Sequence, residues 1–166
     1  MIARLVSGGQ TGVDRAALDV ALALGVRCGG WCPRGRRAED GVIAARYPLR
    51  ETSAAAYAQR TARNVRDSDA TLVLLRGRAA GGTRATLRFA AWRRRPVLVV
   101  RLDRAGGRRV DARSGDVAGW LRSHRVRILN VAGPRESESP GVHADAVRFL
   151  RDLLAGAGRL TSRTER

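Results

Sequence analysis

The chain has 166 residues, which is long enough for one domain with a sizeable core, and its formal net charge is +17. The positive charge suits nonspecific binding to phosphates, but all 32 basic residues are arginines scattered along the chain and few aromatic residues are present to stack on bases. A specific nucleic-acid-binding protein is therefore disfavoured. No apolar run reaches the roughly 18 residues of a membrane span and the first residues lack the apolar core of a signal peptide, so we expect a cytoplasmic protein.

A glycine-rich loop, SGGQTG at residues 7–12, separates a predicted strand at 2–6 from a predicted helix that begins at Val13. Thr11 and Asp14 resemble a capping box at the start of this helix. The free backbone N–H groups of such a loop point at an anion, although a tight turn with glycines for packing is an alternative.

Neither of two common phosphate-binding motifs fits this loop. The dinucleotide fingerprint separates its first two glycines by one residue, whereas Gly8 and Gly9 are adjacent. A P-loop places a lysine before its Ser or Thr, and the chain contains no lysine. The loop therefore indicates an anion without identifying it.

Strands and helices alternate over the rest of the chain. Further strands are predicted at residues 26–31, 70–75, 96–102 and 126–131. Further helices are predicted at residues 53–66, 83–95, 115–123 and 140–154, the last with Ser139 as N-cap and Pro140 as its first residue. Between them lie a long irregular loop at 32–52 and a turn-rich connection at 103–109.

This alternation predicts an α/β fold, a Rossmann-like parallel sheet of about five strands with helices on both faces. We expect residues 1–156 to form a single ligand-binding domain and residues 157–166 a C-terminal tail. Loops that follow parallel strands meet at one edge of the sheet. Here these loops are SGGQTG, CPRGRRAEDG, RGRAAGGT and AGPRES, so we place the functional site at this edge.

Two features near this edge have open interpretations. One helical row is polar and consists of Tyr57, Arg60, Thr61 and Asn64. It could line the site or face solvent. Cys28 and Cys32 match the spacing of neither a redox pair nor a zinc site, so we assign them no role, and we assign no catalytic residue and no metal ligand.

Six blocks carry a family resemblance: SGGQTGVDRAALDVAL, GGWCPRGRRAEDG, YPLRET, RTARNVRDSDATLV, GGTRATL and LNVAGPRESESPGV. Together, over residues 2–154, they resemble the molybdenum cofactor carrier family. That family lies within a Rossmann-like superfamily that includes the lysine-decarboxylase-like phosphoribohydrolases.

The resemblance implies a cytoplasmic homo-oligomer, dimer or tetramer, that binds the molybdenum cofactor (molybdopterin) by its phosphate. Such a protein would store and protect this phosphorylated pterin and hand it on to acceptor or biosynthetic enzymes. The residues implied in ligand binding are Gly8, Gly9, Gln10, Thr11, Gly12, Asp14, Arg34, Gly81, Gly82, Thr83, Arg135, Glu136 and Ser137. We expect Arg135 to clamp the phosphate, oriented by Glu136 or Asp14.

Two alternatives stay open. One is a phosphoribohydrolase-like enzyme that acts on a nucleoside monophosphate. Those relatives carry a Glu two or three residues after the Thr of their glycine loop, where this chain has Ala85 and Thr86, so a binding protein is favoured over an enzyme. The other is a nucleotide-binding or single-stranded-DNA-binding module.

Overall fold

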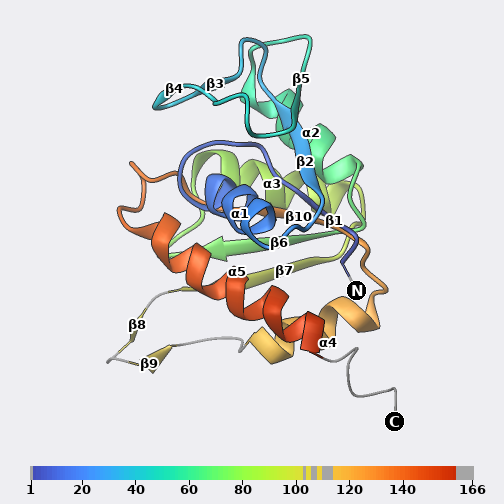
Figure 1. Ribbon diagram of the computed structural model, residues 1–166. Helices are drawn as coiled ribbons and strands as arrows, with labels where there is room; N and C mark the ends of the chain where they lie inside the picture. Colours follow the sequence, from blue (N-terminus) through green and yellow to red (C-terminus); the bar gives the residue numbers. More distant parts are fainter. Residues whose placement is uncertain (1, 103, 106–107, 110–113, 160–166) are drawn as a thin grey trace.

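The computed structural model describes residues 2–102, 104–105, 108–109 and 114–159 of the chain, and a six-stranded parallel sheet runs through it (Figure 1). The strands, in spatial order, are β5 (Leu49–Glu51), β2 (Cys28–Cys32), β1 (Arg4–Val6), β10 (Ile128–Ala132), β6 (Ala70–Leu75) and β7 (Val97–Arg101). The Rossmann-like α/β prediction is thus confirmed, with six strands where the sequence predicted about five.

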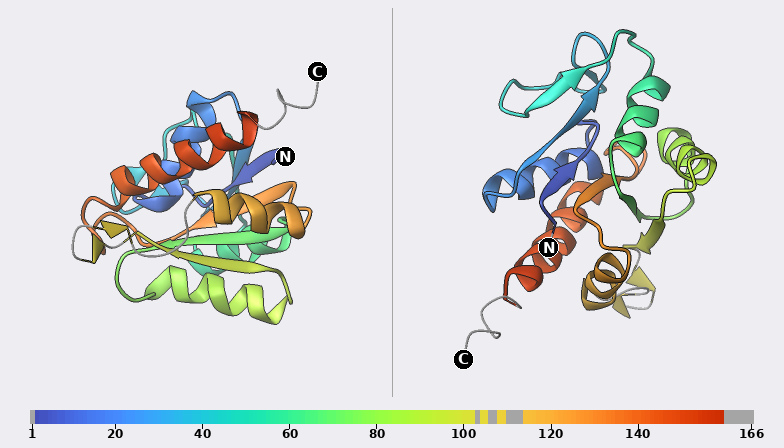
Figure 2. Two further views of the ribbon diagram at one scale, coloured as in Figure 1. Left: turned by 90° about the horizontal axis from the view of Figure 1, so that it is seen from below. Right: turned by 90° about the vertical axis from the view of Figure 1, so that its right-hand side faces the viewer.

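Helices cover both faces of the sheet (Figure 2). One face carries α1 (Val13–Ala23), α4 (Ser114–Ser123) and α5 (Val142–Arg159). The other carries α2 (Tyr57–Arg66) and α3 (Gly81–Trp92). Among the described residues, no helix combines the length and the hydrophobicity that a membrane span requires.

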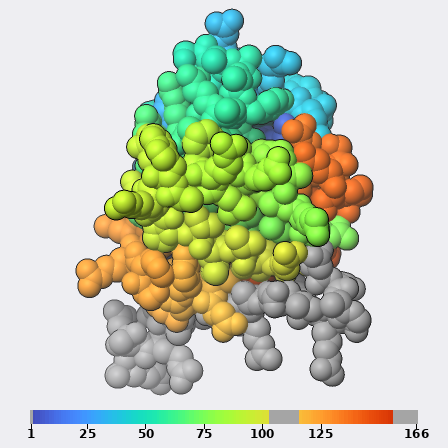
Figure 3. Space-filling view, turned by 180° about the vertical axis from the view of Figure 1, so that it is seen from behind, coloured from blue at the N-terminus to red at the C-terminus, as the bar shows by residue number. Residues whose placement is uncertain are grey.

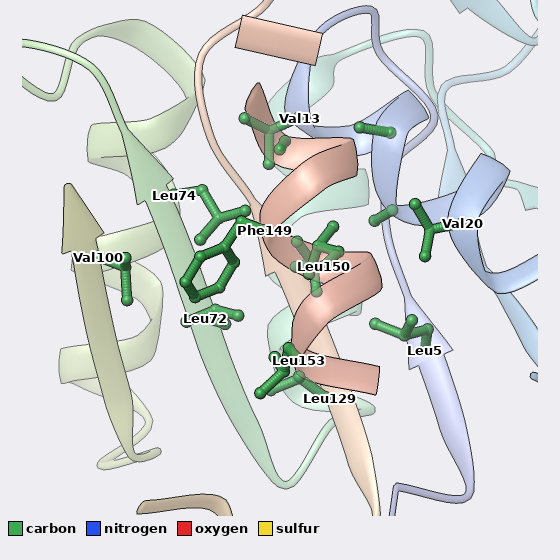
Figure 4. Close-up of a cluster of buried hydrophobic side chains, with 14 of the residues drawn as sticks. Leu5, Val13, Val20, Leu72, Leu74, Val100, Leu129, Phe149, Leu150 and Leu153 are labelled. Atoms are coloured by element: carbon green, nitrogen blue, oxygen red, sulfur yellow. The ribbon is translucent and has the colours of Figure 1, made fainter. Parts of the chain in front are cut away.

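The two faces of the sheet differ in polarity. Toward α1, α4 and α5 the strands present Leu5, Leu72 and Leu129, which pack with Phe149 and Leu150 of α5 in an apolar core (Figure 4). Toward α2 and α3 the buried layer contains many polar side chains, among them Thr61, Asn64, Ser68, Thr71, Thr83, Thr86 and Asn130. The polar row predicted on the second helix is therefore largely buried rather than solvent-facing.

The strand order brings three loops together. The chain moves from β1 to β2 and β5 on one side, and α2 then returns it to β6 on the other side. The last strand, β10, pairs with both β1 and β6 and fills the gap between them. The loops after β1, β10 and β6 are thus neighbours at the carboxyl edge of the sheet, where ligands bind in open α/β sheets.

The predicted irregular loop at 32–52 contains regular structure that the sequence did not reveal. It holds the hairpin of β3 (Arg37–Ala38) and β4 (Gly41–Val42), and also the edge strand β5. One guanidinium organises this segment, because Arg36 donates hydrogen bonds to the backbone carbonyls of Ile43, Ala44, Tyr47 and Leu49. The segment is therefore held in place by a partly buried set of hydrogen bonds from Arg36 to backbone carbonyls.

Several predicted ends were wrong by a few residues. The second helix begins at Tyr57, not at 53, and the third spans Gly81–Trp92 rather than 83–95. The last helix begins at Val142 and continues to Arg159, so the tail predicted from 157 starts as helix; residues 160–166 lie outside the described part of the chain. Within the connection predicted at 103–109, β8 (Arg104–Ala105) pairs with β9 (Arg108–Arg109), and residues 103, 106 and 107 lie outside the description.

The predicted cap of the last helix was also wrong. Instead of Ser139, the carboxylate of Glu136 accepts hydrogen bonds from the backbone N–H groups of Gly141 and His143. A carboxylate at this end is stabilised by the helix dipole as well as by the two hydrogen bonds.

Candidate functional site

A small, partly open cavity of about 30 Å³ lies where the loops after β1 and β10 meet α2 and α3. Its walls are Gln10 and Asp14, Arg60 of α2, Gly82, Thr83 and Thr86 of α3, and Ala132, Gly133, Arg135 and Glu138 from the end of β10 and the loop after it. Figure 3 shows this side of the molecule, with α3 at its centre beside the orange-red segment that leads into α5. The predicted edge of the sheet therefore contains a small, partly open cavity with polar and charged residues in its lining.

A buried ion pair forms the floor of the cavity. Arg60 Nη1 lies 2.8 Å from Asp14 Oδ2, and the two side chains are only 12% and 4% exposed. Burial raises the pKa of the Asp14 carboxyl, while the Arg60 guanidinium and backbone N–H groups of Gln10 and Gly8 act in the opposite direction. The N–H groups of Gly8 and Gln10 in the first loop thus face a carboxylate of the chain itself.

The capping box predicted from Thr11 and Asp14 was wrong. The residue that precedes α1 is Gly12, and no side chain caps the helix. Asp14 instead pairs with Arg60, and the Thr11 hydroxyl donates to Glu39. The spacing matched a cap, but both side chains have stronger partners in distant segments.

Two glycines of the first loop permit close approaches. A Cβ on Gly8 would lie 1.6 Å from Arg60 Nη1, so any side chain there would displace the guanidinium from Asp14. Gly12 has φ 73°, and a Cβ would lie 2.4 Å from the Pro134 carbonyl oxygen. The loop after β1 therefore packs directly against the loop after β10.

Three buried polar atoms at the cavity have no hydrogen-bond partner among the described residues: Gln10 Nε2, Arg60 Nε and Thr83 Oγ1. The orientation of the Gln10 amide follows from its other end, since Oε1 accepts from the N–H groups of Thr11 and Glu39 at 3.0 and 2.9 Å. Gln10 is 6% and Thr83 3% exposed. Leaving a buried donor unpaired costs about 1–3 kcal/mol, so a ligand with acceptor oxygens would relieve this cost.

The first turn of α3 adds positive potential. No side chain caps this helix, and Gly82 and Thr83 of its first turn line the cavity. Unpaired N–H groups and the helix dipole favour an anion at such a position. Arg60 and Arg135 also line the cavity, and each is paired with a carboxylate of the lining, Asp14 and Glu138.

At the mouth of the cavity Arg135 lies between two carboxylates. Its Nε is 3.3 Å from Glu138 Oε1, and its Nη1 is 3.8 Å from Glu39 Oε2. These are not the partners that we expected, Glu136 and Asp14. The guanidinium carbons of Arg135 and Arg60 each lie 6.0 Å from the centre of the Tyr57 ring, so an aromatic surface also borders the mouth.

Glu39 connects three segments of the site. Its carboxylate accepts hydrogen bonds from Thr11 Oγ1, from Ser137 Oγ and from the Ser137 N–H at 3.2 Å. Burial acts to raise the pKa of Glu39, but the hydrogen bonds from Ser137 and Thr11 and the charge of Arg135 outweigh it and hold the pKa below its ordinary value. Glu39 thereby joins the β3–β4 hairpin to the loops after β1 and β10.

The structure separates the predicted ligand-binding residues into groups. Those that line the cavity are Gln10, Asp14, Gly82, Thr83 and Arg135. Thr11, Gly12 and Glu136 border a different, open cavity together with Asp19, Tyr47 and His143. Ser137 donates a hydrogen bond to Glu39, while Gly8 and Gly9 of the first loop lie against Arg60 and Leu49, respectively.

Two predicted residues lie at or beyond the border of the cavity. Gly81 is the first residue of α3, next to the Glu138 carboxylate. Arg34 is exposed, its backbone N–H donates to the Ala54 carbonyl, and it does not line the cavity.

Sequence reasoning missed some residues of the cavity. Arg60 belongs to the polar helical row that we noted, and this row was the available signal. Nothing in the sequence pointed to Glu138 except its position directly after the AGPRES segment. Thr86 is one of the two positions at which phosphoribohydrolase relatives carry a Glu. Cys28 and Cys32 are free thiols away from this cavity, and the described residues contain no cluster of His, Cys, Asp or Glu that could hold a metal ion.

Comparisons with known proteins place the chain among relatives. The family model described as "Circularly permutated YpsA SLOG family" matches residues 5–154. A crystal structure of a "putative molybdenum carrier protein" from Syntrophus aciditrophicus SB is similar, with 39% identity, a TM-score of 0.84, and coverage of 92% of this chain and 95% of that chain. No curated protein matches the chain. The residues matched by the family model include every residue that lines the cavity.

The buried pair should show strong coupling. In Arg60→Met the Asp14 carboxylate stays buried without its cation, so the free energy of unfolding should fall by about 3–5 kcal/mol. In the double variant Asp14→Asn/Arg60→Met no charge is left unpaired, and the loss should be much smaller than the sum of the single losses. Urea unfolding of the four proteins measures this coupling, and additive losses would contradict it.

Glu39 should make stability pH-dependent. Its pKa in the folded protein lies below the ordinary value of 4.5, so its contribution is present above about pH 4.5 and is lost as the pH falls through the folded pKa. The wild type should therefore be more stable than Glu39→Gln at neutral pH, and the difference should shrink in acid. Thermal unfolding across this pH range checks the prediction, and a constant difference would exclude it.

Proposed function

The chain belongs to the circularly permutated YpsA SLOG family, and we propose that it is a carrier whose cavity binds the phosphate of a phosphorylated pterin, the molybdenum cofactor. It would store this ligand, protect it and hand it on. The 39% identical neighbour named as a molybdenum carrier supports the carrier role. The family resemblance seen in the sequence supports the same ligand.

One observation carries the proposal: three buried polar atoms that lack a partner among the described residues belong to side chains that line one cavity, which the start of α3 also lines. A phosphate would accept hydrogen bonds from Gln10 Nε2, Arg60 Nε and the Thr83 hydroxyl, and from N–H groups of the first helical turn. Each charge-assisted bond is worth roughly 1.5–3 kcal/mol before losses. The polar atoms that cost stability in the free protein thus become ligand contacts.

Phosphate alone would bind weakly, because association costs about 4 kcal/mol or more. The cavity volume of about 30 Å³ is far below the roughly 300–1,000 Å³ of ligand pockets, so the cavity has room for a small group such as a phosphate and not for a ring system. We therefore place the phosphate inside and the ring system at the mouth, beside Tyr57 and Arg135. Trp31, another candidate ring contact, is not a cavity residue: its Nε1 donates to Asp67 and Arg63 stacks on its ring.

A binding role fits the carboxylates of the cavity better than a hydrolytic role. Asp14 and Glu138 each pair with an arginine, Arg60 and Arg135. At the position of an enzyme's carboxylate, the Thr86 hydroxyl donates to the Gly82 carbonyl at 3.0 Å. A phosphoribohydrolase-like activity is the alternative, and release of free base from AMP or GMP would reveal it.

Gly82→Asp should abolish ligand binding and leave the fold intact. A Cβ on Gly82 meets no atom within 4 Å, so the side chain fits, but its carboxylate would repel a phosphate at the start of α3. We would purify the protein without oxygen from a host that makes the molybdenum cofactor and identify bound small molecules by mass spectrometry. The wild type should release a phosphorylated pterin and Gly82→Asp should release none.

The matched control is Gly119→Asp on α4, which also has room for a side chain and lies away from the cavity. It should retain the ligand. A wild type that releases nucleotides and no pterin would contradict the carrier proposal, and a Gly82→Asp variant that keeps its ligand would contradict the phosphate position.

Thr83→Val should stabilise the free protein and weaken ligand binding. The Thr83 hydroxyl is buried without a partner, so its removal should raise the free energy of unfolding by up to about 1–2 kcal/mol. In the control Thr61→Val the lost hydroxyl donates to the Tyr57 carbonyl, and stability should fall. Urea unfolding with and without AMP, as a phosphate-bearing probe, checks both effects; a Thr83→Val variant that is less stable when free would refute the assignment.

A further inference from the structure

One carboxylate at the cavity accepts no side-chain or backbone hydrogen bond from the described residues. Glu138 follows β10, and its Oε1 lies 3.3 Å from Arg135 Nε. The same oxygen is 3.2 Å from the position that a Cβ on Gly81 would take. The side chain thus lies between Arg135 and the start of α3, where an anion is favoured.

Neighbouring carboxylates are held more firmly. Glu39 accepts hydrogen bonds from Thr11 and Ser137, and Glu136 accepts two from the backbone at the start of α5. For Glu138, the described residues provide one ion pair, to Arg135, and 34% of its side chain is exposed. Glu138 can therefore change rotamer at lower cost than either neighbour.

We infer that Glu138 occupies the anion position in the ligand-free protein and competes with the phosphate of an incoming ligand. This inference rests on the proposed function. Two anions cannot share Arg135 and the first turn of α3 without repulsion, so the Glu138 carboxylate must turn toward solvent when a phosphate enters. The competition lowers the affinity for every phosphate by a similar factor.

This competition sets a threshold of affinity and leaves the ratio between two phosphorylated ligands unchanged. Inorganic phosphate has only its oxygens to displace Glu138, whereas a phosphorylated ring compound also gains contacts beside Tyr57. A weak ligand such as inorganic phosphate is therefore left largely unbound, while a ligand with further contacts stays bound. Because the carboxylate can return, it also speeds release of the ligand, which suits a carrier.

The test compares Glu138→Gln with the wild type by titration calorimetry, with inorganic phosphate and AMP as probes. The variant keeps the size of the side chain and removes its charge, so both probes should bind about tenfold more tightly. The control Asp145→Asn makes the same change in net charge at a residue that pairs with Arg76 and Arg148, outside the cavity. It should leave both affinities unchanged. Circular dichroism confirms that each variant is folded.

The outcomes separate this inference from the proposed function. Tighter binding by Glu138→Gln alone supports the inference. If the wild type binds the probes and Glu138→Gln binds them equally or more weakly, the inference is overturned and the phosphate site stands. Equal tightening in Asp145→Asn assigns the effect to net charge and also overturns it. If neither the wild type nor Glu138→Gln binds either probe at millimolar concentrations, the phosphate site itself is wrong.

Discussion

The buried ion pair between Arg60 and Asp14 is the interaction on which the site depends. Asp14 belongs to α1 on one face of the sheet and Arg60 to α2 on the other, and they meet above Gly8 at the carboxyl edge. Two charges that are nearly excluded from water need each other, which fixes the relative positions of both helices and of the first loop. The guanidinium is large enough to pair with Asp14 through Nη1 and still leave Nε at the cavity without a partner.

The difference between the two faces of the sheet follows from this arrangement. Toward α1, α4 and α5 the core is apolar and supplies most of the hydrophobic stabilisation. Toward α2 and α3 the buried layer is polar, and its side chains form hydrogen bonds such as that from Asn130 Nδ2 to Thr71 Oγ1. The cavity lies at the end of this layer. A polar layer packs with less hydrophobic gain, and the unpaired groups at its end reduce stability further. The hydrophobic gain is therefore larger on the side of α1, α4 and α5 than on the side where the ligand is proposed to bind.

The segment between β2 and α2 shows how a long connection becomes part of the site. Arg36 donates hydrogen bonds to four backbone carbonyls and so fixes the shape of the segment. Glu39 accepts hydrogen bonds from Thr11 and Ser137, which connects the segment to the loops after β1 and β10. In both cases a charged side chain forms hydrogen bonds with backbone or hydroxyl groups. Such charge-assisted hydrogen bonds are stronger than neutral ones. Residues that the family resemblance implied in ligand binding, Thr11 and Ser137, thus hold the walls of the site together.

The sequence by itself determined the elements whose patterns are local. The continuous apolar run at 70–75 is strand β6 with the predicted bounds, and the apolar spacing from Val13 produced α1. The order of strands and glycine loops was enough to bring these loops together at the carboxyl edge, because loops that follow parallel strands lie at that edge.

Only the tertiary structure decided which side chains meet there. Arg60 pairs with Asp14, which is 46 positions away in the sequence. Glu39 accepts hydrogen bonds from Thr11 and Ser137, which are 28 and 98 positions away. Strand β5 has three residues and exists through its pairing with β2. These contacts depend on burial and charge between segments that are distant in the sequence. Local sequence periodicity therefore does not predict them.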